Sequence, residues 1–314
     1  MIDIFAYWFE LSSARVKRND CLSDLILLSA GVKQGGILSP LFFSAFIDVV
    51  LIELEKCKLG CFVKGRCLNS ILYADDLVLV SSSVTDLQLL FNIAYQTLDG
   101  LDLQINFNKS SCLRIGKRFS SKVGPITVKD KTIAWVNEAA YLGLSIMSNC
   151  RFCCNWQLAK KKFFTAINTI YSNLGSNPEL KVILSLFQSS CIPILTYGLS
   201  ALSLTRAEIQ SLSFTFNNLF HKLFKIANKQ ILEQCQFFCG VLNFPVAYDL
   251  LRFSFLHSLF VKGKMSDPDS LEADDFNDYC AINKKYRLEF TDSNRTVKFK
   301  MWSFLEQSLF LNEL

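Results

Sequence analysis

The tetrapeptide Tyr73-Ala74-Asp75-Asp76 stands between two short apolar runs, Ser70-Ile71-Leu72 and Leu77-Val78-Leu79-Val80. Both runs are rich in β-forming residues, and a tight turn between two such runs predicts a β-hairpin. Two adjacent carboxylates would then lie at the tip of a buried hairpin, where burial is costly unless a cation neutralises them. Mg²⁺ prefers carboxylate oxygens together with substrate phosphates, so the pattern indicates a metal site for phosphoryl or nucleotidyl transfer. Because aspartate is also a common turn residue, two solvated turn aspartates fit the same tetrapeptide.

A glycine-containing block precedes this hairpin and reads Gly31-Val32-Lys33-Gln34-Gly35-Gly36-Ile37-Leu38-Ser39-Pro40-Leu41-Phe42-Phe43-Ser44. Gly35 and Gly36 permit unusual backbone angles or the close approach of a ligand. The Ser39-Pro40 pair predicts a helix start, with Ser39 as N-cap and Pro40 at the first helical position. Apolar residues then recur at helical spacing, namely Leu41, Phe42, Ala45, Phe46, Val49, Val50 and Ile52.

Taken together, the two blocks resemble reverse transcriptases of the non-LTR (LINE-type) retrotransposon class. The resemblance implies that residues 31–44 contact template and nucleotide, with Gln34, Gly35 and Gly36 lining that site and Tyr73 beside it. It implies that residues 73–76 are the catalytic hairpin of the palm, where Asp75 and Asp76 bind Mg²⁺, Asp75 most directly. Such an enzyme uses two Mg²⁺ ions, and its expected partners are an RNA template, an RNA–DNA duplex and a dNTP.

The resemblance continues downstream and covers roughly residues 5–225. A helix is predicted from a Thr85 cap to about Leu98, ended by Asp99-Gly100, and residues 101–115 are expected to be extended. Asn106-Phe107-Asn108-Lys109 resembles the family's Asn-x-x-Lys element, which implies that Lys109 lies near the triphosphate; a solvated strand lysine fits equally. Tyr141-Leu142-Gly143 resembles the block that supports the primer end, although an ordinary strand end with a glycine turn fits as well.

One expected element is missing from the sequence. Two-metal catalysis needs carboxylates that bridge both ions, and the resemblance implies a first aspartate on an earlier palm strand. Only 30 residues precede Gly31, and their acids are Asp3, Glu10, Asp20 and Asp24. Asp3 lies too close to the glycine block and Asp20 lies in a polar turn. We therefore expect an N-terminally truncated domain without polymerase activity of its own. A non-catalytic nucleic-acid-binding remnant is the alternative, and the glycine block argues against a nucleotide cyclase.

Composition and charge distribution fit a globular chain with a basic region. Hydrophobic residues make up 51% of the 314 positions and charged residues 19%, which excludes a disordered chain. The net charge of +5 says little by itself. Lysines and arginines nevertheless gather between residues 109 and 162, where only Asp130 and Glu138 oppose them, which predicts a phosphate-contacting face; a solvated polar face fits as well. The basic residues are Lys109, Arg114, Lys117, Arg118, Lys122, Lys129, Lys131, Arg151, Lys160, Lys161 and Lys162.

The twelve cysteines favour reduced thiols over metal or disulfides. The chain starts without a secretory signal, so we expect an intracellular protein in the cytoplasm or nucleus, not a secreted one, and no disulfides. Cys150-x-x-Cys153-Cys154 resembles half a zinc site. The second half would need another close Cys/His pair, and the only histidines are His221 and His257. The pattern therefore argues against zinc.

The chain beyond residue 150 is predicted to be helical. A helix is expected over 156–174, followed by a break with a helix start at Asn177-Pro178. A second helix is expected over 179–192, which Pro193 breaks or kinks, and a third helix begins with Thr205 and Glu208 as a capping box. By position these helices would be the polymerase thumb. The uncharged run 182–205 is long enough to span a bilayer, but its Ser, Gln, Pro and Gly residues favour buried helices, so no membrane partner is expected.

The predicted fold class is α+β, a partial polymerase palm followed by an all-helical thumb and a helical C-terminal region. The expected domains are a partial reverse transcriptase palm over 1–148, a helical thumb over 149–227 and a helical region over 228–314. Residues 267–278 hold six acids and no base, which predicts an exposed acidic linker. No chemistry can be assigned to residues 228–314.

Overall fold

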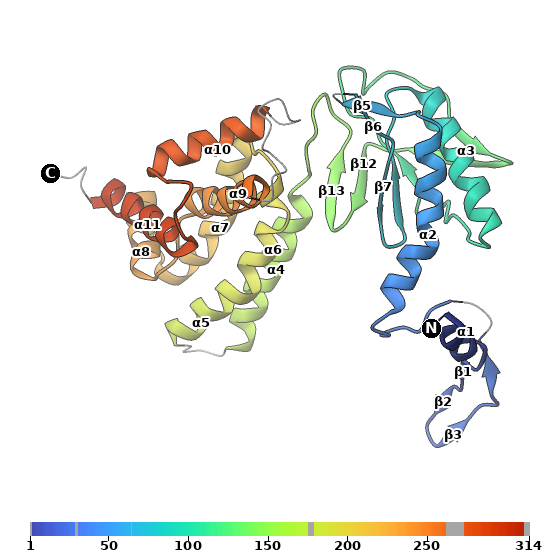
Figure 1. The fold of residues 1–314 in the computed structure, drawn as a ribbon. Helices are drawn as coiled ribbons and strands as arrows, with labels where there is room; N and C mark the ends of the chain where they lie inside the picture. The colour runs from blue at the N-terminus through green and yellow to red at the C-terminus, as the bar shows by residue number, and fades with distance from the viewer. Residues whose placement is uncertain (1, 29–30, 64, 175–178, 262–272, 311–314) are drawn as a thin grey trace. The chain divides into compact units, whose positions relative to one another are not determined.

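The computed structural model describes residues 2–28, 31–63, 65–174, 179–261 and 273–310. The chain forms two compact units, the first comprising residues 1–111 and 122–134 and the second residues 112–121 and 135–314. The described residues combine helices with small antiparallel sheets, in agreement with the predicted α+β class (Figure 1). The domain boundaries expected near residues 148 and 227 stay a prediction.

The first unit opens with a short helix and two small antiparallel hairpin-like pairs. Strand β1 pairs with β4, and β2 pairs with β3. Asn19 and Asp20 form the turn between β2 and β3, so the loop predicted at Asp20 is confirmed. These opening elements are α1 (Ile2–Glu10), β1 (Ser13–Ala14), β2 (Lys17–Arg18), β3 (Cys21–Leu22) and β4 (Ile26–Leu27).

The core of the first unit lies between two long helices and a hairpin. Its fully buried residues come from α2 and α3, and the hairpin strands β7 and β8 pack against them (Figure 1). A shorter hairpin, β5 (Cys61–Val63) with β6 (Arg66–Leu68), separates α2 from β7. The core-forming elements are α2 (Ser39–Lys56), β7 (Ser70–Tyr73), β8 (Asp76–Leu79) and α3 (Val84–Gly100).

Both long helices begin differently from the prediction. Leu38, not Ser39, occupies the cap position of α2 and gives no side-chain cap. Ser39 lies in the first helical turn, and its hydroxyl donates to the Lys33 carbonyl (2.7 Å), which ties the glycine block to this turn. Helix α3 is capped by Ser83, whose side chain accepts from the Asp86 amide (3.0 Å), so the predicted Thr85 cap is wrong.

The strand expected over residues 101–115 is mostly absent. Only β9 (Ser111–Cys112) is a strand, and residues 107–109 form a turn. The turn forms because the Asn106 carbonyl accepts from the Lys109 amide (3.1 Å), and its side-chain oxygen accepts from the same amide (3.2 Å). Next along the chain, β10 (Ile126–Val128) and β11 (Lys131–Trp135) form an antiparallel hairpin.

The second unit joins a hairpin to a series of helices. Strands β12 and β13 pair with Tyr141 opposite Leu144, which leaves a two-residue turn. The elements are β12 (Glu138–Tyr141), β13 (Leu144–Met147), α4 (Gln157–Asn173), α5 (Leu180–Leu186), the π-helix η1 (Phe187–Cys191), α6 (Ile192–Thr196), the 3-10 helix η2 (Leu199–Ala201), α7 (Arg206–Phe224), α8 (Lys229–Phe238), α9 (Phe244–Val261), α10 (Ala273–Tyr286) and α11 (Asn294–Phe310).

Two helix predictions in this unit are confirmed. Helix α4 covers nearly the whole predicted range, and its Phe163 and Ile167 are fully buried. Helix α7 starts with the predicted capping box, in which the Thr205 hydroxyl accepts from the Glu208 amide and the Glu208 carboxylate accepts from the Thr205 amide. The helix start expected at Asn177-Pro178 lies outside the described residues.

Pro193 follows a widened helical turn and does not end the helical path. A proline in an α-helix lacks the amide donor and clashes with the carbonyl four residues earlier. Here residues 187–191 adopt the π-helix η1, and α6 begins at Ile192 with Pro193 in its first turn. The uncharged run 182–205 is therefore divided among α5, η1, α6 and η2. In the part of the chain that the structure describes, no helix has the length and apolarity to cross a membrane.

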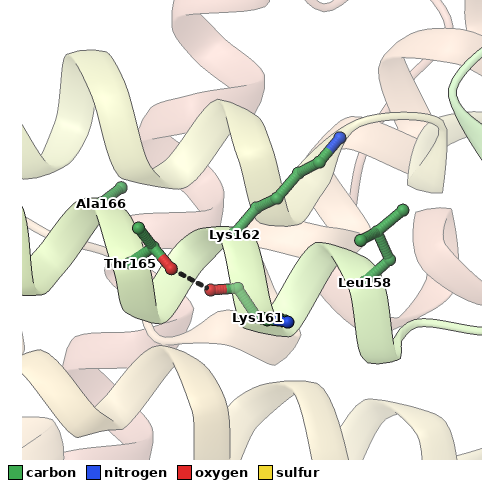
Figure 2. Close-up of a pocket in the computed structure, with 5 residues that line it drawn as sticks. All are labelled: Leu158, Lys161, Lys162, Thr165 and Ala166. Atoms are coloured by element: carbon green, nitrogen blue, oxygen red, sulfur yellow. Dashed lines mark hydrogen bonds between the residues drawn. The ribbon is translucent and has the colours of Figure 1, made fainter.

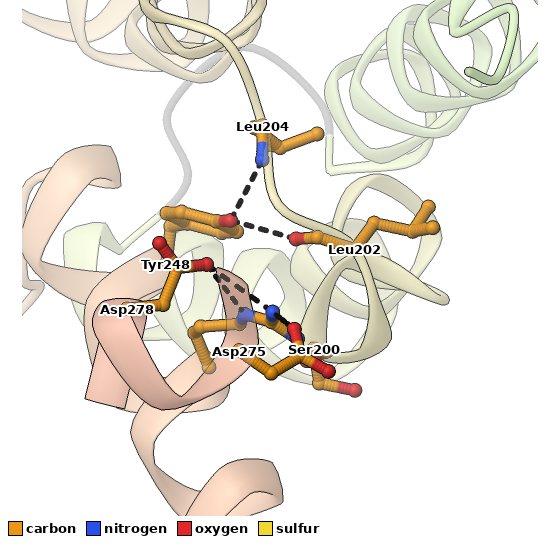
Figure 3. A network of polar contacts seen from close by, with 7 residues as sticks. Ser200, Leu202, Leu204, Tyr248, Asp275 and Asp278 are labelled. Carbon is orange, nitrogen blue, oxygen red and sulfur yellow. Dashed lines mark hydrogen bonds and ion pairs between the residues drawn. The ribbon is translucent and has the colours of Figure 1, made fainter. Parts of the chain in front are cut away.

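The predicted acidic linker is wrong for residues 273–278. They form the start of α10, while residues 267–272 lie outside the described part. The reason is a buried partner on α9: Arg252 is 1% exposed and pairs with Asp275 and with Asp278 (3.2 Å). Arg252 also donates to the Ser200 carbonyl (3.2 Å), and a buried guanidinium needs such partners (Figure 3).

Two hydrophobic clusters build the second unit. The first gathers buried side chains from α4 to the start of α9, including Phe163, Phe187, Phe216 and Phe220. The second gathers α9, α10 and α11 around Phe253. Tyr248 belongs to the first cluster, and its hydroxyl donates to the Leu202 carbonyl and accepts from the Leu204 amide (Figure 3).

Candidate active site

The hairpin of β7 and β8 presents the two adjacent aspartates. Ser70 pairs with Leu79 and Tyr73 with Asp76, so Ala74 and Asp75 are the two turn residues. Ala74 has a φ of 52°, and a positive φ at the first central position is typical of the tight turns that match the twist of a hairpin. The hairpin predicted at residues 70–80 is therefore confirmed, with Asp75 in the turn and Asp76 at the start of β8.

One face of this hairpin is anchored to the helices behind it. Leu72, Leu77 and Leu79 pack against the buried residues of α2 and α3. At the base of the hairpin, Asn69 is 4% exposed; its amide donates to the Leu54 carbonyl at the end of α2 (2.7 Å). The hairpin is thus fixed to α2, the same helix that the glycine block opens.

The two aspartates lie on the surface, so the prediction of a buried tip is wrong. Asp75 and Asp76 are exposed, and their carboxylates have no hydrogen-bond or ion-pair partner among the described residues. The reason is that the other face of the hairpin is uncovered: Ile71 is 45% and Tyr73 is 62% exposed. Within the described chain, β7 and β8 pair only with each other. Exposure removes the argument from burial cost, so solvated turn aspartates fit this geometry as well as a metal site does.

The donor set at the tip fits one Mg²⁺ ion. Mg²⁺ is commonly held by one or two carboxylates together with water and substrate phosphates, and Asp75 and Asp76 supply hard oxygen ligands open to solvent. The described residues contain no group of three or more His, Cys, Asp or Glu side chains that could hold a metal ion. A two-ion site bridged by further carboxylates is therefore not assembled from the residues that the structure describes.

The glycine block forms a surface turn at the start of α2. Gly35 has a φ of 78°, and the Gly36 amide donates to the Lys33 carbonyl (3.0 Å). A Cβ on Gly36 would lie 2.5 Å from Ser39 Oγ, so a larger residue would displace the Ser39 hydroxyl from its hydrogen bond to Lys33. Gln34 is exposed beside it. Three of the predicted template- and nucleotide-contacting residues, Gln34, Gly35 and Gly36, therefore lie on one helix-opening turn, where Gly35 is exposed and Gly36 is half-buried.

Lys109 projects from the Asn106–Lys109 turn on the α3 side of the first unit. Phe107 fixes this turn through edge-to-face contact with Phe91 of α3, with ring centroids 6.3 Å apart. The Lys109 side chain is exposed and makes no hydrogen bond or ion pair within the described residues. It is thus an unpaired cation in the same unit as Asp75 and Asp76.

The turn Tyr141-Leu142-Gly143 belongs to the second unit, whereas the paired aspartates belong to the first. Leu142 has a φ of 45° and Gly143 a φ of 80°, as in a two-residue hairpin turn with both central residues left-handed. The Tyr197 hydroxyl donates to the Leu142 carbonyl (2.8 Å). Tyr197 was not among the residues predicted from the sequence, although a glycine just after a helix, here Gly198, is a signal of a turn.

The basic residues predicted to form one face are divided between the two units. Several already contact aromatic rings: Lys129 lies over Tyr95 (5.0 Å) and Lys131 over Phe107 (4.9 Å). On α4, a shallow groove of about 360 Å³ lies between apolar and basic side chains (Figure 2). The groove is lined by Leu158, Lys161, Lys162, Thr165 and Ala166.

The cysteines do not gather into a metal site. All twelve are described and none is paired in a disulfide. Cys150 is exposed, the Cys153 sulfur accepts from the Asn149 amide, and Cys154 is buried in the first hydrophobic cluster. Burial raises the pKa of the Cys154 thiol, which disfavours the thiolate form that binds zinc.

Comparison with known proteins adds independent findings. The family model described as reverse transcriptase (RNA-dependent DNA polymerase) matches residues 5–146. An uncharacterised transposon-derived protein of Caenorhabditis elegans is 27% identical over 173 residues, which cover 55% of this chain and 62% of that protein. The retrovirus-related Pol polyprotein from a type-2 retrotransposable element of Drosophila melanogaster is 29% identical over 144 residues, 42% of this chain and 13% of that protein. The chain thus spans less than two thirds of either relative.

Proposed function

We propose that this chain is part of the polymerase domain of a non-LTR retrotransposon protein, because the reverse transcriptase family model matches residues 5–146. The parent enzyme would join dNTPs to a primer along an RNA template. The observation that carries the proposal is the exposed, unpaired Asp75–Asp76 couple at the tip of a hairpin packed on the glycine-opened helix α2.

The paired aspartates would hold the metal ion. When bound, Mg²⁺ would neutralise the charge of the triphosphate and polarise the reacting oxygens. Asp75 in the turn and Asp76 at the start of β8 would orient that ion and the phosphates it carries. Their exposure supports this role, because substrate and water must reach the same oxygens.

The surrounding residues would position template and nucleotide. The glycine turn, in which Gly35 is exposed and Gly36 is half-buried, would let the template–nucleotide pair approach closely, with Gln34 and Tyr73 beside it. Lys109, an exposed cation without a protein partner, would lie near the triphosphate and the departing pyrophosphate.

The second unit would handle the primer and the product duplex. Tyr141, Leu142 and Gly143 would support the primer end as a rigid hairpin turn. The helices from α4 to α7 would act as the thumb, and the lysines of α4 would contact phosphates. Contacts of that kind give an affinity that is independent of sequence and falls with salt.

A non-catalytic nucleic-acid-binding role is the second candidate. It is favoured by the finding that no group of three metal-ligating side chains gathers in the described residues. We therefore predict that the chain alone does not extend a primer. Template-dependent extension in Mg²⁺ that Asp75→Ala abolishes would contradict this prediction and favour the complete enzyme.

Metal binding tests the role of the paired aspartates directly. Mn²⁺, which has a readable paramagnetic signal and similar ligand preferences, can be titrated into the chain and followed by electron paramagnetic resonance. Asp75→Asn is expected to weaken Mn²⁺ binding at least tenfold, because an amide replaces a charged ligand. Asp20→Asn is the matched control, since Asp20 is an exposed aspartate in another hairpin turn. Equal affinities in the two variants would refute the metal site.

Duplex binding separates the two candidate functions. A labelled RNA–DNA duplex is titrated with the chain at several salt concentrations, in parallel with the extension assay. Salt-dependent binding without extension supports the remnant, whereas binding with extension supports the enzyme. No binding of metal or duplex would contradict both.

A further inference from the structure

Two turns of the second unit interlock through their glycines. One is the hairpin turn at Leu142 and Gly143. The other joins α6 to η2: Tyr197 has φ −58° and ψ 125°, and Gly198 has φ 75° and ψ −9°. These angles are those of a type II turn, which requires a residue with positive φ at its second central position, usually glycine.

Each glycine receives a side chain from the opposite turn. A Cβ on Gly143 would lie 3.2 Å from Cε1 of Tyr197, and a Cβ on Gly198 would lie 2.8 Å from Cδ2 of Leu144. The Tyr197 ring therefore lies on the backbone of the hairpin turn, while the Leu144 side chain lies on the backbone of the helix turn. The Tyr197 hydroxyl adds a hydrogen bond to the Leu142 carbonyl (2.8 Å).

This interlock fixes a strained turn to a rigid base. Leu142 holds a positive φ of 45°, which is unfavourable for a residue with a branched side chain. Leu195 and Leu199, on either side of the Tyr197–Gly198 turn, are fully buried in the first hydrophobic cluster. Tyr197 itself is 57% exposed, so burial does not explain its position; the contact with the hairpin does.

We propose that Tyr197 and Gly198 are positioning residues that hold the Tyr141–Gly143 turn in place for the 3′ end of a primer strand. The inference rests on the primer-support role proposed above for that turn. Tyr197 acts through the Leu142 carbonyl and the Gly143 backbone, and it need not touch the nucleic acid.

Hydrogen exchange of the hairpin tests the interlock without any substrate. Tyr197→Phe keeps the ring and removes the hydroxyl, so amide exchange in residues 138–147 should accelerate roughly threefold to tenfold. Tyr171→Phe is the matched control, because the Tyr171 hydroxyl is buried in the same unit and has no hydrogen-bond partner. It should leave exchange in the hairpin unchanged.

A pair of glycine variants separates contact from backbone strain. Gly198→Ala introduces a Cβ against Leu144, whereas Gly240→Ala has a similar positive φ of 70° and open space around it. Only Gly198→Ala should speed exchange in residues 138–147. If neither Tyr197→Phe nor Gly198→Ala changes that exchange, the interlock does not position the turn and the inference is overturned.

Binding of primer ends tests the role of the positioned turn. The affinity of the chain for an RNA–DNA duplex with a recessed primer 3′ end is divided by its affinity for the blunt duplex. Tyr197→Phe should lower this ratio at an unchanged melting temperature, and Tyr171→Phe should not. If Tyr197→Phe speeds hydrogen exchange but the unaltered chain binds recessed and blunt duplexes equally well, the interlock is upheld and primer support is refuted. An end preference that Tyr197→Phe leaves intact, despite faster exchange, would overturn the positioning role.

Discussion

The Glu138 carboxylate links the two strands of the β12–β13 hairpin to the chain that follows. It accepts hydrogen bonds from the Ser145 hydroxyl on β13 and from the Asn155 amide (3.0 Å). Hydrogen bonds to the charged form, first from Ser145 and then from Asn155, lower the pKa of Glu138 below its ordinary value of 4.5. The charge on Glu138 is therefore part of what holds the hairpin together.

This predicts that the stability of the fold depends on pH through Glu138. The lowered pKa means that the folded chain binds a proton at Glu138 less readily than the unfolded chain does. The ionised Glu138 carboxylate therefore adds to the free energy of unfolding in full above pH 4.5, and this contribution is lost as pH falls through the lowered pKa. An NMR titration should place the Glu138 midpoint below 4.5, and Ser145→Ala should move it upward. Ser148→Ala should not, since that hydroxyl donates to the Arg114 carbonyl. An unaltered midpoint in Ser145→Ala would contradict the assignment.

The position of a residue along a hairpin could be predicted from the sequence, but its exposure and its long-range contacts could not. Asp75 and Asp76 could be located at a hairpin tip because strand alternation and turn chemistry are local signals. Their exposure could not be predicted, because it depends on what covers the opposite face of the hairpin. Tyr197 and Arg252 were missed for a related reason: their partners lie 55 and 52 residues away at Leu142 and Ser200, and no local pattern encodes such contacts.

The start of helix α3 shows how two adjacent cap candidates are resolved by geometry. Ser83 has extended backbone angles and its side chain accepts from the Asp86 amide, whereas Thr85 already lies inside the helix. A cap residue must be non-helical itself while its side chain reaches the amides two or three residues ahead. Thr85 satisfies the compositional rule but not the backbone requirement.

This geometry predicts a clear difference between two small substitutions. Ser83→Ala should destabilise α3 by about 1 kcal/mol, because it leaves the Asp86 amide without its acceptor. Thr85→Ala, at an exposed site with no hydrogen bond of its side chain to lose, should cost less than about 0.5 kcal/mol. Amide exchange along α3 measures both. An equal or larger effect of Thr85→Ala would refute the Ser83 cap.

Helices were predicted better than strands for a physical reason. The apolar residues of α2, α4 and α7 recur over many turns, so their spacing is informative. Strands such as β1 and β3 contain two residues each and have no periodicity to detect. The extended segment expected over 101–115 is interrupted by a turn, because the Asn106 side chain accepts a hydrogen bond from the Lys109 amide that would otherwise be available to a neighbouring strand.

The two units differ in how much of their apolar surface they bury. The second unit contains two clusters of buried side chains, whereas the first has a single cluster of five buried residues. Many large apolar side chains near the start of the first unit are exposed, including Tyr7, Trp8, Leu11, Leu27 and Ile37. Local stability follows buried apolar contacts, so this opening segment is expected to unfold locally most easily.

Limited proteolysis measures that difference. Trypsin should cut at Arg15, Lys17 and Arg18 before it cuts at Arg206 or Lys222 in α7, because cleavage requires locally opened backbone. Mass spectrometry of early time points identifies the order of cuts. Early cleavage within α7, with the opening segment intact, would contradict the difference in stability.

The assignment of β12 and β13 to the helical unit also lay beyond the sequence. The hairpin joins that unit because Leu144 and Ile146 pack against the first hydrophobic cluster. A reading along the chain places these strands with the preceding ones, since strands and helices separate near residue 150. The contacts of two half-buried side chains group this hairpin with the helices, while the domain boundary expected near residue 148 stays a prediction.

The π-helix at Phe187–Cys191 determines which way the side chains of the following helix α6 point. A π-helical turn contains about one residue more than an α-helical turn. Each residue of an α-helix rotates the chain by about 100° around the helix axis. Loss of one residue from this segment would let ordinary winding resume and would swing Leu195 out of the core. The same rotation would carry the Tyr197 hydroxyl away from the hairpin that it now holds. The extra residue of the π-turn thus keeps Leu195 facing the core and the Tyr197 hydroxyl facing the hairpin.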